Sequence, residues 1–595
     1  MIGAAGPNAG PVGLRPSTGL IGPSAGLTGP DAGLTGPVGP HAGLTGPSVG
    51  SAGPSAGLTG PSVGSAGPVG PHAGLTVGAV TLRALRRFPD RVAFSWDGGS
   101  LSYAGAADLI GRIQRVYAEL GLRPGQRIAV LTGNRAESWC AAVAAQASGL
   151  VLSWLHPLGS LPDQLFQLAD LDAAAVVVDA DRHAARGAEL AEALDGPRVL
   201  AVGPADFGPD LVAAAERVGA SAALDVANPG DVVAISYTGG TTGRSKGALR
   251  RHPSVVLQSL TAILGDFELP ADPRYLAVAP ISHVAGTKIV PTLVRGGTVH
   301  LLNGFTPDRV LDAIARERLT FTLLVPTMIY ALLDCPNLER TDLSSLELLL
   351  YGASPMSATR LLEGLDRIGP VFSQLYGQTE CYPISVLRRA EHDPLDRPEL
   401  IASCGAPVST VAVALLDADG APVPAGEAGE LCVRGGGVME EYWQRPELTA
   451  ETFAHGWLHT GDIARADDRG YLYIVDRAKD MIITGGFNVY PREVEDALTA
   501  HPAVLAAAVY GTPDEKWGEA VNAAVVLRAG AAADAGAGAG AGADAGAGVT
   551  AAELIAHVKE LKGSVQAPKS VQVLTELPMT AVGKVDKKAL RRRQG

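Results

Sequence analysis

The alternation of apolar and polar positions between residues 77 and about 476 predicts a layered α/β domain. Residues 101–122 place apolar side chains every three to four positions, the spacing of an amphipathic helix. The mostly apolar stretch at 138–151 predicts a buried helix. Short apolar runs that predict strands lie at 127–133, 173–180 and 198–203. Because strands alternate with helices, we expect largely parallel sheets packed against helices.

A smaller α+β unit is predicted to follow. Its elements are a glycine loop that leads into a helix, two strands and a second helix, at 483–500, 504–511, 519–527 and 550–563. Residues 529–548 are nearly all Ala, Gly and Asp, which is typical of a flexible surface insertion without its own function.

The first 76 residues differ from the rest of the chain in being a low-complexity sequence. The sequence AGLTGP recurs irregularly, starting at Ala25, Ala32, Ala42 and Ala56, with a shortened copy at Ala73. A segment dominated by Gly and Pro has too little apolar surface to offset its ordering entropy. We therefore expect a disordered low-complexity tail, and no residue in it indicates a role.

Composition narrows the function. The net charge of −13 argues against a nucleic-acid binder. The five cysteines form no CxxC pair, which predicts reduced thiols, no disulfide framework and no zinc site. The chain has no apolar run of the ~18 residues that a membrane span needs, and its start lacks a secretory pattern. We expect a cytoplasmic protein without an integral membrane segment.

The most distinctive motif is a loop rich in glycine and threonine, YTGGTTGRSKGA at 237–248, directly after the apolar run 232–236. Glycines let backbone N–H groups approach phosphate oxygens, threonine hydroxyls add donors, and lysine adds positive charge. The spacing is not that of a Walker P-loop, because Gly rather than Ser or Thr follows Lys246. A flexible hairpin turn is the alternative. The predicted phosphate-binding residues are Thr238, Gly239, Gly240, Thr241, Thr242, Gly243 and Lys246.

Three later motifs carry further chemistry: SQLYGQTE at 373–380, WLHTGDIARADDRGYLYIVDR at 457–477 and LPMTAVGKVDKKALRRR at 577–593. A carboxylate such as Glu380 beside a polyphosphate is repelled unless a divalent cation bridges them, and Mg²⁺ prefers oxygen ligands. Asp462 follows a Thr-Gly turn, where an acceptor-only carboxylate suits ribose hydroxyls. The structural alternatives are a surface turn at Glu380, a turn cap at Asp462 and an Arg477–Asp476 pair.

In this order, the motifs resemble the signatures of the adenylate-forming (ANL) superfamily, in particular its acyl-CoA synthetase branch of fatty-acyl and aryl CoA ligases. The resemblance runs from about residue 77 to the end. It implies a large adenylation domain at 77–476, a hinge at 477–480 centred on Lys479, and a small mobile α+β domain at 481–595. The small domain would turn at the hinge between two active conformations, one for each half-reaction.

The resemblance also implies roles for single residues. Tyr376 and Gly377 would lie near the adenine, Thr379 at phosphate, Glu380 with Thr242 at Mg²⁺, and Asp462 with Arg477 at the ribose. Lys584 would stabilise the charge that builds up as a carboxylate attacks the α-phosphate. The implied catalytic residues are Lys584, Lys246, His283 and Glu380. Gly485 and Gly486 would leave room for a thiol channel.

The acyl pocket is less well defined by sequence. The resemblance places His283, Lys288, Tyr351 and Gly352 in it, and Gly352, Ala353 and Ser354 in the wall shared with the adenine. A lone His among apolar residues is more often a packed core residue. Lys288 lies in an apolar helical stretch, where an unpaired charge is costly. It either reaches solvent along its own stem or faces the pocket and favours a polar or anionic group.

The function implied is activation of a small carboxylic acid by MgATP to an acyl-adenylate, with release of pyrophosphate, followed by thioester formation with coenzyme A. Three alternatives remain. One is a free-standing adenylation enzyme that loads a carrier protein. Another is a ligase with a non-thiol acceptor or an unusual anionic substrate. The third is a non-catalytic nucleotide-binding scaffold, which Glu380, Asp462, Arg477 and Lys584 argue against.

Overall fold

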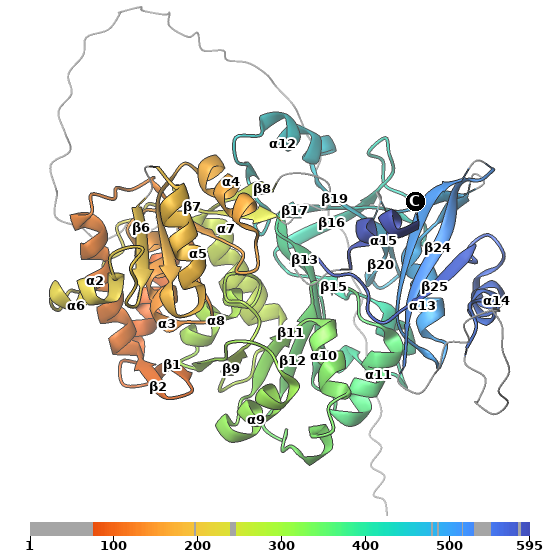
Figure 1. The fold of residues 1–595 in the computed structure, drawn as a ribbon, viewed down its shortest axis with the longest axis horizontal. Helices are drawn as coiled ribbons and strands as arrows, with labels where there is room; N and C mark the ends of the chain where they lie inside the picture. The colour runs from red at the N-terminus through yellow and green to blue at the C-terminus, as the bar shows by residue number, and fades with distance from the viewer. Residues whose placement is uncertain are drawn as a thin grey trace, which may run out of the picture. The chain divides into compact units, whose positions relative to one another are not determined.

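The structure is a computed structural model, and it describes residues 75–195, 198–238, 245–477, 480–484, 487–514, 516–528, 549–580 and 585–594. The low-complexity tail, apart from its last two residues, and the insertion predicted at 529–548 lie outside these ranges. Figure 1 shows the arrangement of the helices and strands.

The first sheet has nine strands in the order β15-β14-β13-β12-β11-β9-β10-β1-β2. Its central strands, from β13 to β1, pair in parallel, and both ends pair antiparallel. Their bounds, in that order, are Ala406–Pro407, Cys381–Leu387, Phe372–Gln378, Leu348–Gly352, Phe321–Leu324, Arg274–Ala277, Thr298–Leu301, Val92–Trp96 and Gly99–Ser102.

The second sheet has seven strands in the order β18-β8-β7-β4-β3-β5-β6. It is parallel from β7 to β6, and antiparallel where β8 pairs with β7 and β18. The bounds, in that order, are Glu441–Tyr442, Lys246–Arg251, Val232–Thr238, Val151–Trp154, Arg127–Leu131, Ala173–Asp179 and Arg198–Val202.

Helices cover these two sheets. They are α1 (Val77–Arg87), α2 (Tyr103–Glu119), α3 (Ala136–Ala147), α4 (Leu161–Leu171), α5 (Ala180–Ala193), α6 (Leu211–Arg217), α7 (His252–Leu257), α8 (Ile289–Val294), α9 (Pro307–Glu317), α10 (Pro326–Leu333) and α11 (Ala358–Arg367). A π-helix at Gln258–Asp266 extends α7, and a 3-10 turn at Gly286–Lys288 precedes α8. One buried cluster contains side chains of α1, α2, α3, α8 and both sheets, so the two sheets share a core.

A third sheet is wholly antiparallel, with the order β16 (Val411–Leu416), β17 (Gly429–Gly435), β19 (Leu458–Ala466) and β20 (Leu472–Arg477). Helix α12 (Pro446–Thr452) precedes β19. The expectation of largely parallel sheets therefore describes the central strands of the first two sheets, while this sheet departs from it. Only β19 and β20 are joined by a short hairpin, whereas β18 and α12 lie between β17 and β19, and antiparallel pairing of this kind requires no crossover to a parallel strand.

The small unit near the C-terminus has a fourth sheet, in the order β22 (Phe487–Val489), β21 (Ile482–Thr484), β24 (Gly518–Leu527) and β23 (Val504–Asp514), with β25 (Ser570–Leu574) parallel to β24. Its helices are α13 (Pro491–Thr499), α14 (Ala551–Lys562) and α15 (Lys587–Gln594). Thr550 and Glu553 form a capping box at the start of α14. The prediction of a large α/β domain followed by a small α+β domain is confirmed.

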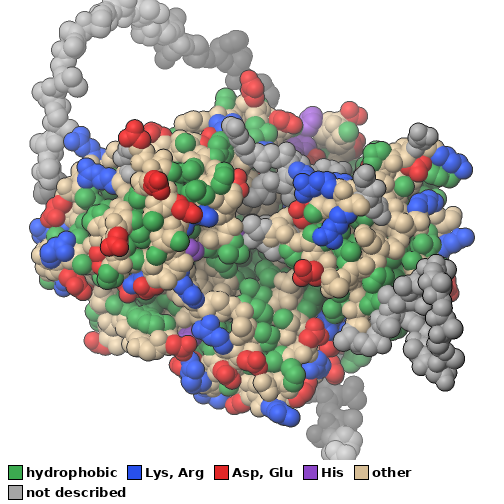
Figure 2. All heavy atoms as spheres, in the orientation of Figure 1, with side chains coloured by type: hydrophobic (Ala, Val, Ile, Leu, Met, Phe, Trp, Pro, Cys, Tyr) green, Lys and Arg blue, Asp and Glu red, His purple; other side chains and the backbone are tan. Residues whose placement is uncertain are grey.

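Within the described ranges, no helix combines the length and the apolarity needed to cross a bilayer. On the face of the molecule in Figure 2, Lys and Arg side chains are interspersed with Asp and Glu. That face carries no extended basic patch of the kind that would bind a nucleic-acid backbone.

Candidate active site

The glycine-threonine loop closes a hairpin of the second sheet. Strands β7 and β8 pair antiparallel, with Thr238 opposite Lys246. The residues between them at 239–244, including the predicted Gly239, Gly240, Thr241, Thr242 and Gly243, lie outside the described ranges. The hairpin and phosphate-loop interpretations are thus compatible. The described ends of the loop place Thr238 and Lys246 at the mouth of the hairpin.

Three residues predicted at the nucleotide meet where β13, β19 and β20 come together. The Tyr376 hydroxyl, at the end of β13, donates to Oδ2 of Asp462 at 2.6 Å. Nε of Arg477 lies 3.1 Å from Oδ1 of the same carboxylate. The strand register causes this, because Asp462 on β19 lies directly opposite Arg477 on β20. The side chain of Arg477 pairs with Asp462, while Asp476 accepts only its backbone N–H.

This carboxylate is shielded from water, since Asp462 is 4 % exposed. Burial, and then the neighbouring Asp462 charge, hold the pKa of Tyr376 well above its usual value of 10.0. The phenol is therefore a stable hydrogen-bond donor at neutral pH. Low solvent access strengthens each contact of the Asp462 carboxylate.

A second group forms around Glu380. The hydroxyl of Tyr442, on β18, donates to Oε1 of Glu380 at 2.6 Å. Nζ of Lys246 lies 5.2 Å from the centre of the Tyr442 ring, within cation–π range. Tyr442 therefore connects the predicted metal ligand to the predicted phosphate lysine. Sequence reasoning missed Tyr442, because its only signal was a tyrosine in the segment EEYW, 62 residues after Glu380.

The backbone around Glu380 is also held in place. The buried Arg250 donates from Nη2 to the carbonyl of Thr379 and from Nη1 to that of Gly437, each at 2.8 Å. The carbonyl of Glu380 accepts the N–H of Met439 at 2.7 Å. The oxygen atoms of the Glu380 carboxylate and the Thr238 hydroxyl are the donor type that Mg²⁺ prefers, so this part of the chain fits that ion.

A pair of histidines lies on the acyl side of the predicted site. The rings of His283 and His156 meet edge to face, with centroids 4.5 Å apart. Oγ of Ser282 lies 2.8 Å from Nδ1 of His283. The His283 side chain is exposed to solvent, so it is not the packed core residue of the alternative interpretation.

Lys288 is wholly buried, with no exposed surface. The sequence-based alternative that it reaches solvent is therefore wrong. Its Nζ lies 2.5 Å from the Tyr382 hydroxyl, 2.8 Å from Oγ1 of Thr287 and 3.4 Å from the carbonyl of Val284. Burial lowers the pKa of Lys288 well below 10.5. Nζ is the donor in all three contacts, each to an uncharged oxygen, so no negative charge among these partners offsets the cost of burying the protonated amine.

Tyr351 and Gly352 have structural roles. Tyr351 is buried in a hydrophobic cluster, and its hydroxyl lies 2.9 Å from Nε2 of His392. A Cβ at Gly352 would come within 2.2 Å of the Leu375 carbonyl, so strand pairing requires glycine there. The next residues, Ala353 and Ser354, are less buried, and Ala353 has φ of +65°. This left-handed turn redirects the chain at the end of β12.

Four other predicted residues, Lys479, Gly485, Gly486 and Lys584, lie outside the described ranges. Their surroundings are described in part. Asp476 accepts the N–H of Arg477 through Oδ1 and that of Arg492, at the start of α13, through Oδ2. Burial raises the pKa of Asp476 to about 6, and Lys587 partly offsets this. The carboxylate of Asp476 thus joins the predicted end of the large domain to the small one.

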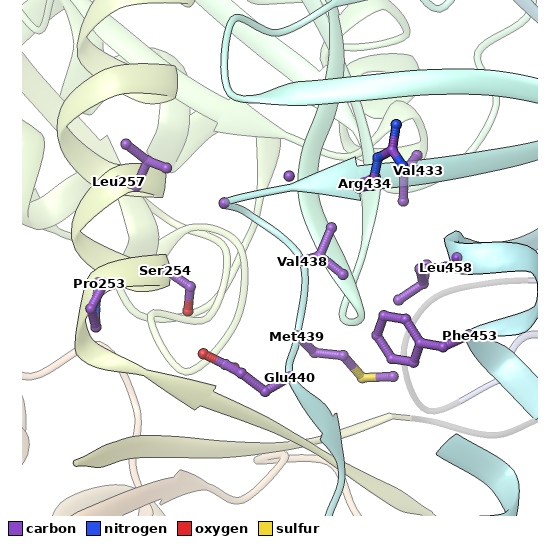
Figure 3. Close-up of a pocket in the computed structure, with 13 residues that line it drawn as sticks. Pro253, Ser254, Leu257, Val433, Arg434, Val438, Met439, Glu440, Phe453 and Leu458 are labelled. Carbon is purple, nitrogen blue, oxygen red and sulfur yellow. The ribbon is translucent and has the colours of Figure 1, made fainter. Parts of the chain in front are cut away.

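A cavity of about 410 Å³ lies apart from these residues. In Figure 3, side chains from α7, β17 and the start of β19 surround it, among them Leu257, Val433 and Leu458. None of the predicted site residues lines it. Met439 and Glu440 of its wall precede Tyr442 on the chain, so the cavity borders the segment that leads into the strand carrying this tyrosine.

Comparisons with known proteins agree with this arrangement. The chain is 42% identical over 526 residues to a medium/long-chain-fatty-acid–CoA ligase of Mycobacterium tuberculosis, covering 87% of this chain and 90% of that protein. It is 37% identical to a feruloyl-CoA synthase of an Amycolatopsis species, covering 87% and 99%. An amide bond synthetase of Marinactinospora thermotolerans superimposes with a TM-score of 0.77 at 33% identity, covering 87% and 100%.

The family models give the same result for both parts of the chain. The model described as AMP-binding enzyme matches residues 82–443, and that of the AMP-binding enzyme C-terminal domain matches 493–584. The prediction of an ATP-dependent acid–CoA ligase that works through an acyl-adenylate is confirmed at this level. The chain belongs to the family of AMP-binding enzymes, the adenylate-forming ligases.

Proposed function

We propose that this protein activates a monocarboxylic acid with a neutral acyl or aryl group and transfers it to coenzyme A. The observation that carries the nucleotide half is the convergence of Tyr376, Asp462 and Arg477 from three strands. In this proposal, the Asp462 carboxylate accepts from the ribose hydroxyls, Arg477 holds that carboxylate in place, and Tyr376 lies against the adenine.

The first half-reaction joins a carboxylate oxygen of the acid to the α-phosphorus of ATP and breaks the bond to pyrophosphate. Lys246 and the backbone of the glycine-threonine loop would hold the phosphates, and Lys584 would meet the charge on the reacting carboxylate. Mg²⁺, held by Glu380 and the hydroxyl of Thr242 or Thr238, would neutralise phosphate charge. Tyr442 would orient Glu380 for this task.

In the second half-reaction, the thiol of coenzyme A attacks the acyl carbonyl and AMP leaves. The small domain would turn about Lys479 between the two steps, and Gly485 and Gly486 would line the thiol path. The domain limits of 77–476, 477–480 and 481–595 are part of this proposal. Asp476 supports a hinge at this position, because it bonds to the backbone on both sides.

The neutral acyl group follows from Lys288. Within the described part of the chain its amine contacts no carboxylate, and it is held by Tyr382 and Thr287. An uncharged amine adds no net positive charge, so it does not stabilise a second carboxylate on the substrate. The M. tuberculosis and Amycolatopsis relatives are named for fatty acids and for ferulate, both of which have neutral acyl groups.

Measuring pyrophosphate release with a panel of acids tests both half-reactions of the proposed function. The panel contains medium- and long-chain fatty acids, hydroxycinnamates and dicarboxylates, each with and without coenzyme A. We expect release with one of the first two classes, little with dicarboxylates, and stimulation by coenzyme A with formation of a thioester. Absence of pyrophosphate release with every acid would contradict the adenylation proposal.

The choice of acceptor is tested in a separate experiment, because the amide bond synthetase of M. thermotolerans shares this fold at 33% identity. Primary amines therefore replace coenzyme A in parallel reactions with the best acid. Amide formation that is faster than thioester formation would overturn the choice of coenzyme A and leave the adenylation step intact.

A further inference from the structure

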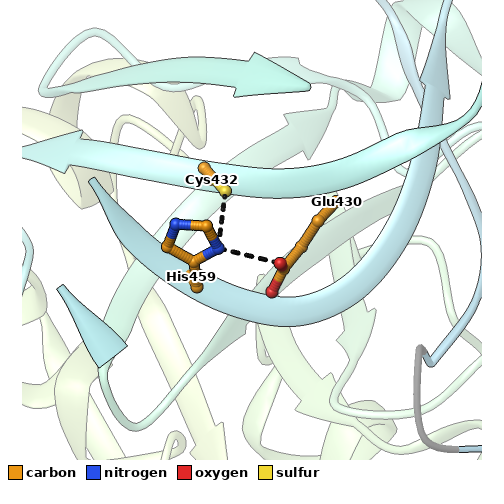
Figure 4. Close-up of side chains that lie close together, drawn as sticks. All are labelled: Glu430, Cys432 and His459. Atoms are coloured by element: carbon orange, nitrogen blue, oxygen red, sulfur yellow. Dashed lines mark hydrogen bonds and ion pairs between the residues drawn. The ribbon is translucent and has the colours of Figure 1, made fainter. Parts of the chain in front are cut away.

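A glutamate, a cysteine and a histidine converge on the third sheet. Nδ1 of His459 lies 2.8 Å from Oε2 of Glu430 and 3.5 Å from Sγ of Cys432. The three ligand atoms all lie within 4.8 Å of one another, and no second group of this kind occurs in the described part of the chain. Figure 4 shows the three side chains turned toward a common point between β17 and β19.

The strands bring these residues together. Glu430 and Cys432 are two positions apart on β17, so their side chains lie on the same face. His459 on β19 lies directly opposite Cys432. Directly opposed side chains of an antiparallel pair are cross-strand neighbours, which makes the contact a consequence of the sheet register.

The donor set suits zinc. Thiolate, imidazole and carboxylate are the three ligand types that protein zinc sites use. Zn–N of about 2.0 Å and Zn–S of about 2.3 Å at a tetrahedral angle require the nitrogen and sulfur to be about 3.5 Å apart. The observed 3.5 Å between Nδ1 and Sγ meets this. The Glu430 oxygen must move back about 0.5 Å for the same geometry, and its 26% exposed side chain has room to do so.

The surrounding contacts orient the ligands as in a metal site. Nε2 of His459 lies 3.2 Å from the carbonyl of Ala454, to which it donates, so Nδ1 is the nitrogen left for a cation. A metal-ligating histidine usually donates its other ring N–H to such an acceptor. The second carboxylate oxygen of Glu430 accepts the N–H of Gly461 at 2.9 Å, which fixes the glutamate from behind.

We propose that Glu430, Cys432 and His459 bind a divalent cation of the zinc class, with three protein ligands and the fourth position left to water. Binding displaces the thiol proton of Cys432 and the proton shared by His459 and Glu430. Since Gly461 immediately precedes Asp462, a bound cation restrains the turn that carries this carboxylate. The site thus connects metal binding to the nucleotide side of the enzyme.

Cobalt spectroscopy on the full-length protein tests the proposal without an activity measurement. The protein is stripped with a chelator, dialysed and titrated with Co²⁺. We expect one equivalent to bind with thiolate-to-metal charge-transfer absorption and tetrahedral d–d bands, and Zn²⁺ to displace it. A wild-type protein that binds Co²⁺ without a thiolate band, or does not bind it, overturns the site.

Cysteine variants give the matched control. Cys432→Ser should lose the charge-transfer band and weaken Zn²⁺ binding at least about 10-fold, because a hydroxyl replaces a thiolate ligand. Cys335→Ser, at another buried cysteine, should leave both unchanged. His459→Asn is measured alongside and should also weaken binding. Equal Zn²⁺ affinity in the wild type, Cys432→Ser and His459→Asn would assign the metal to another part of the chain.

A stability measurement completes the test. A ligand that binds only the folded protein raises Tm. Zn²⁺ should therefore raise the Tm of the wild type and of Cys335→Ser but not that of Cys432→Ser. If the three residues form only an ion pair and a thiol contact and bind no metal, Zn²⁺ should leave every Tm unchanged. If a variant does not fold, the wild-type cobalt spectrum decides the question.

Discussion

The two sides of the proposed active site handle charge in opposite ways. On the nucleotide side, the Asp462 carboxylate pairs with the Arg477 guanidinium and accepts a hydrogen bond from Tyr376. On the acyl side, the protein buries Lys288 among a hydroxyl pair and aromatic rings, which favours the neutral amine. The nucleotide side thus contains paired charged groups, whereas the acyl side contains neutral hydrogen-bonding groups. This difference predicts that the two sides respond differently to substitution and to pH.

The largest effect is expected on the charged side. Asp462→Asn removes the negative charge that pairs with Arg477 and, in our proposal, accepts from the ribose. Hydrogen bonds to charged groups contribute about 1.5 to 3 kcal/mol each, so we expect kcat/KM for ATP to fall about 100-fold. ATP–pyrophosphate exchange measures it. The exposed Asp468→Asn is the control, and a normal kcat/KM in Asp462→Asn would remove the ribose role.

On the acyl side, the buried amine of Lys288 should affect how the free energy of unfolding depends on pH. The pKa of Lys288 is lowered in the folded protein, so between that value and 10.5 the unfolded state binds a proton that the folded state does not. The free energy of unfolding therefore rises with pH in this window, by up to about 1.4 kcal/mol per pH unit.

Denaturant unfolding of Lys288→Met against the wild type isolates this contribution. The variant should lack the rise, whereas Lys516→Met, at an exposed lysine, should keep it. Parallel pH curves for the wild type and Lys288→Met would mean that the buried amine is charged, and the contrast between the two sides would fail.

A smaller effect is expected at Tyr442. Tyr442→Phe removes the donor to Glu380 and leaves the ring beneath Lys246 in place. Losing one hydrogen bond to a charged group should lower the rate of adenylate formation about 10-fold and raise the Mg²⁺ concentration needed for half-maximal rate. Tyr473→Phe removes a 3.4 Å tyrosine–carboxylate contact elsewhere and is the control. An unchanged Mg²⁺ requirement would show that Tyr442 does not orient Glu380 for metal binding.

The smallest effect concerns acid preference. Lys288→Met removes a hydrogen-bonding group without removing a charge, so it should change the ratio of kcat/KM between a hydroxylated acid and its unsubstituted analogue by about 3- to 10-fold. The paired acids act as an internal control. An unchanged ratio would place Lys288 outside the acyl pocket.

Much of the nucleotide side could be predicted from sequence because its residues belong to continuous motifs. Asp462 and Arg477 lie in one 21-residue segment at 457–477, and hairpin pairing alone brings them together. Tyr442 and His156 could not be predicted. Each contacts its partner across more than 60 positions, and Tyr442 reaches Glu380 only because β18 joins the second sheet next to β8.

The sequence alone determined the two-part α/β and α+β organisation, through its hydrophobic periodicity, and the adenylating chemistry, through local motifs. Only the tertiary structure decided the state of Lys288, because whether a long side chain reaches water depends on every segment around it. The same holds for Tyr351, which strand packing places in the core, and for the Glu430, Cys432 and His459 group. Cross-strand register brings that group together, and no spacing along the chain specifies such a register.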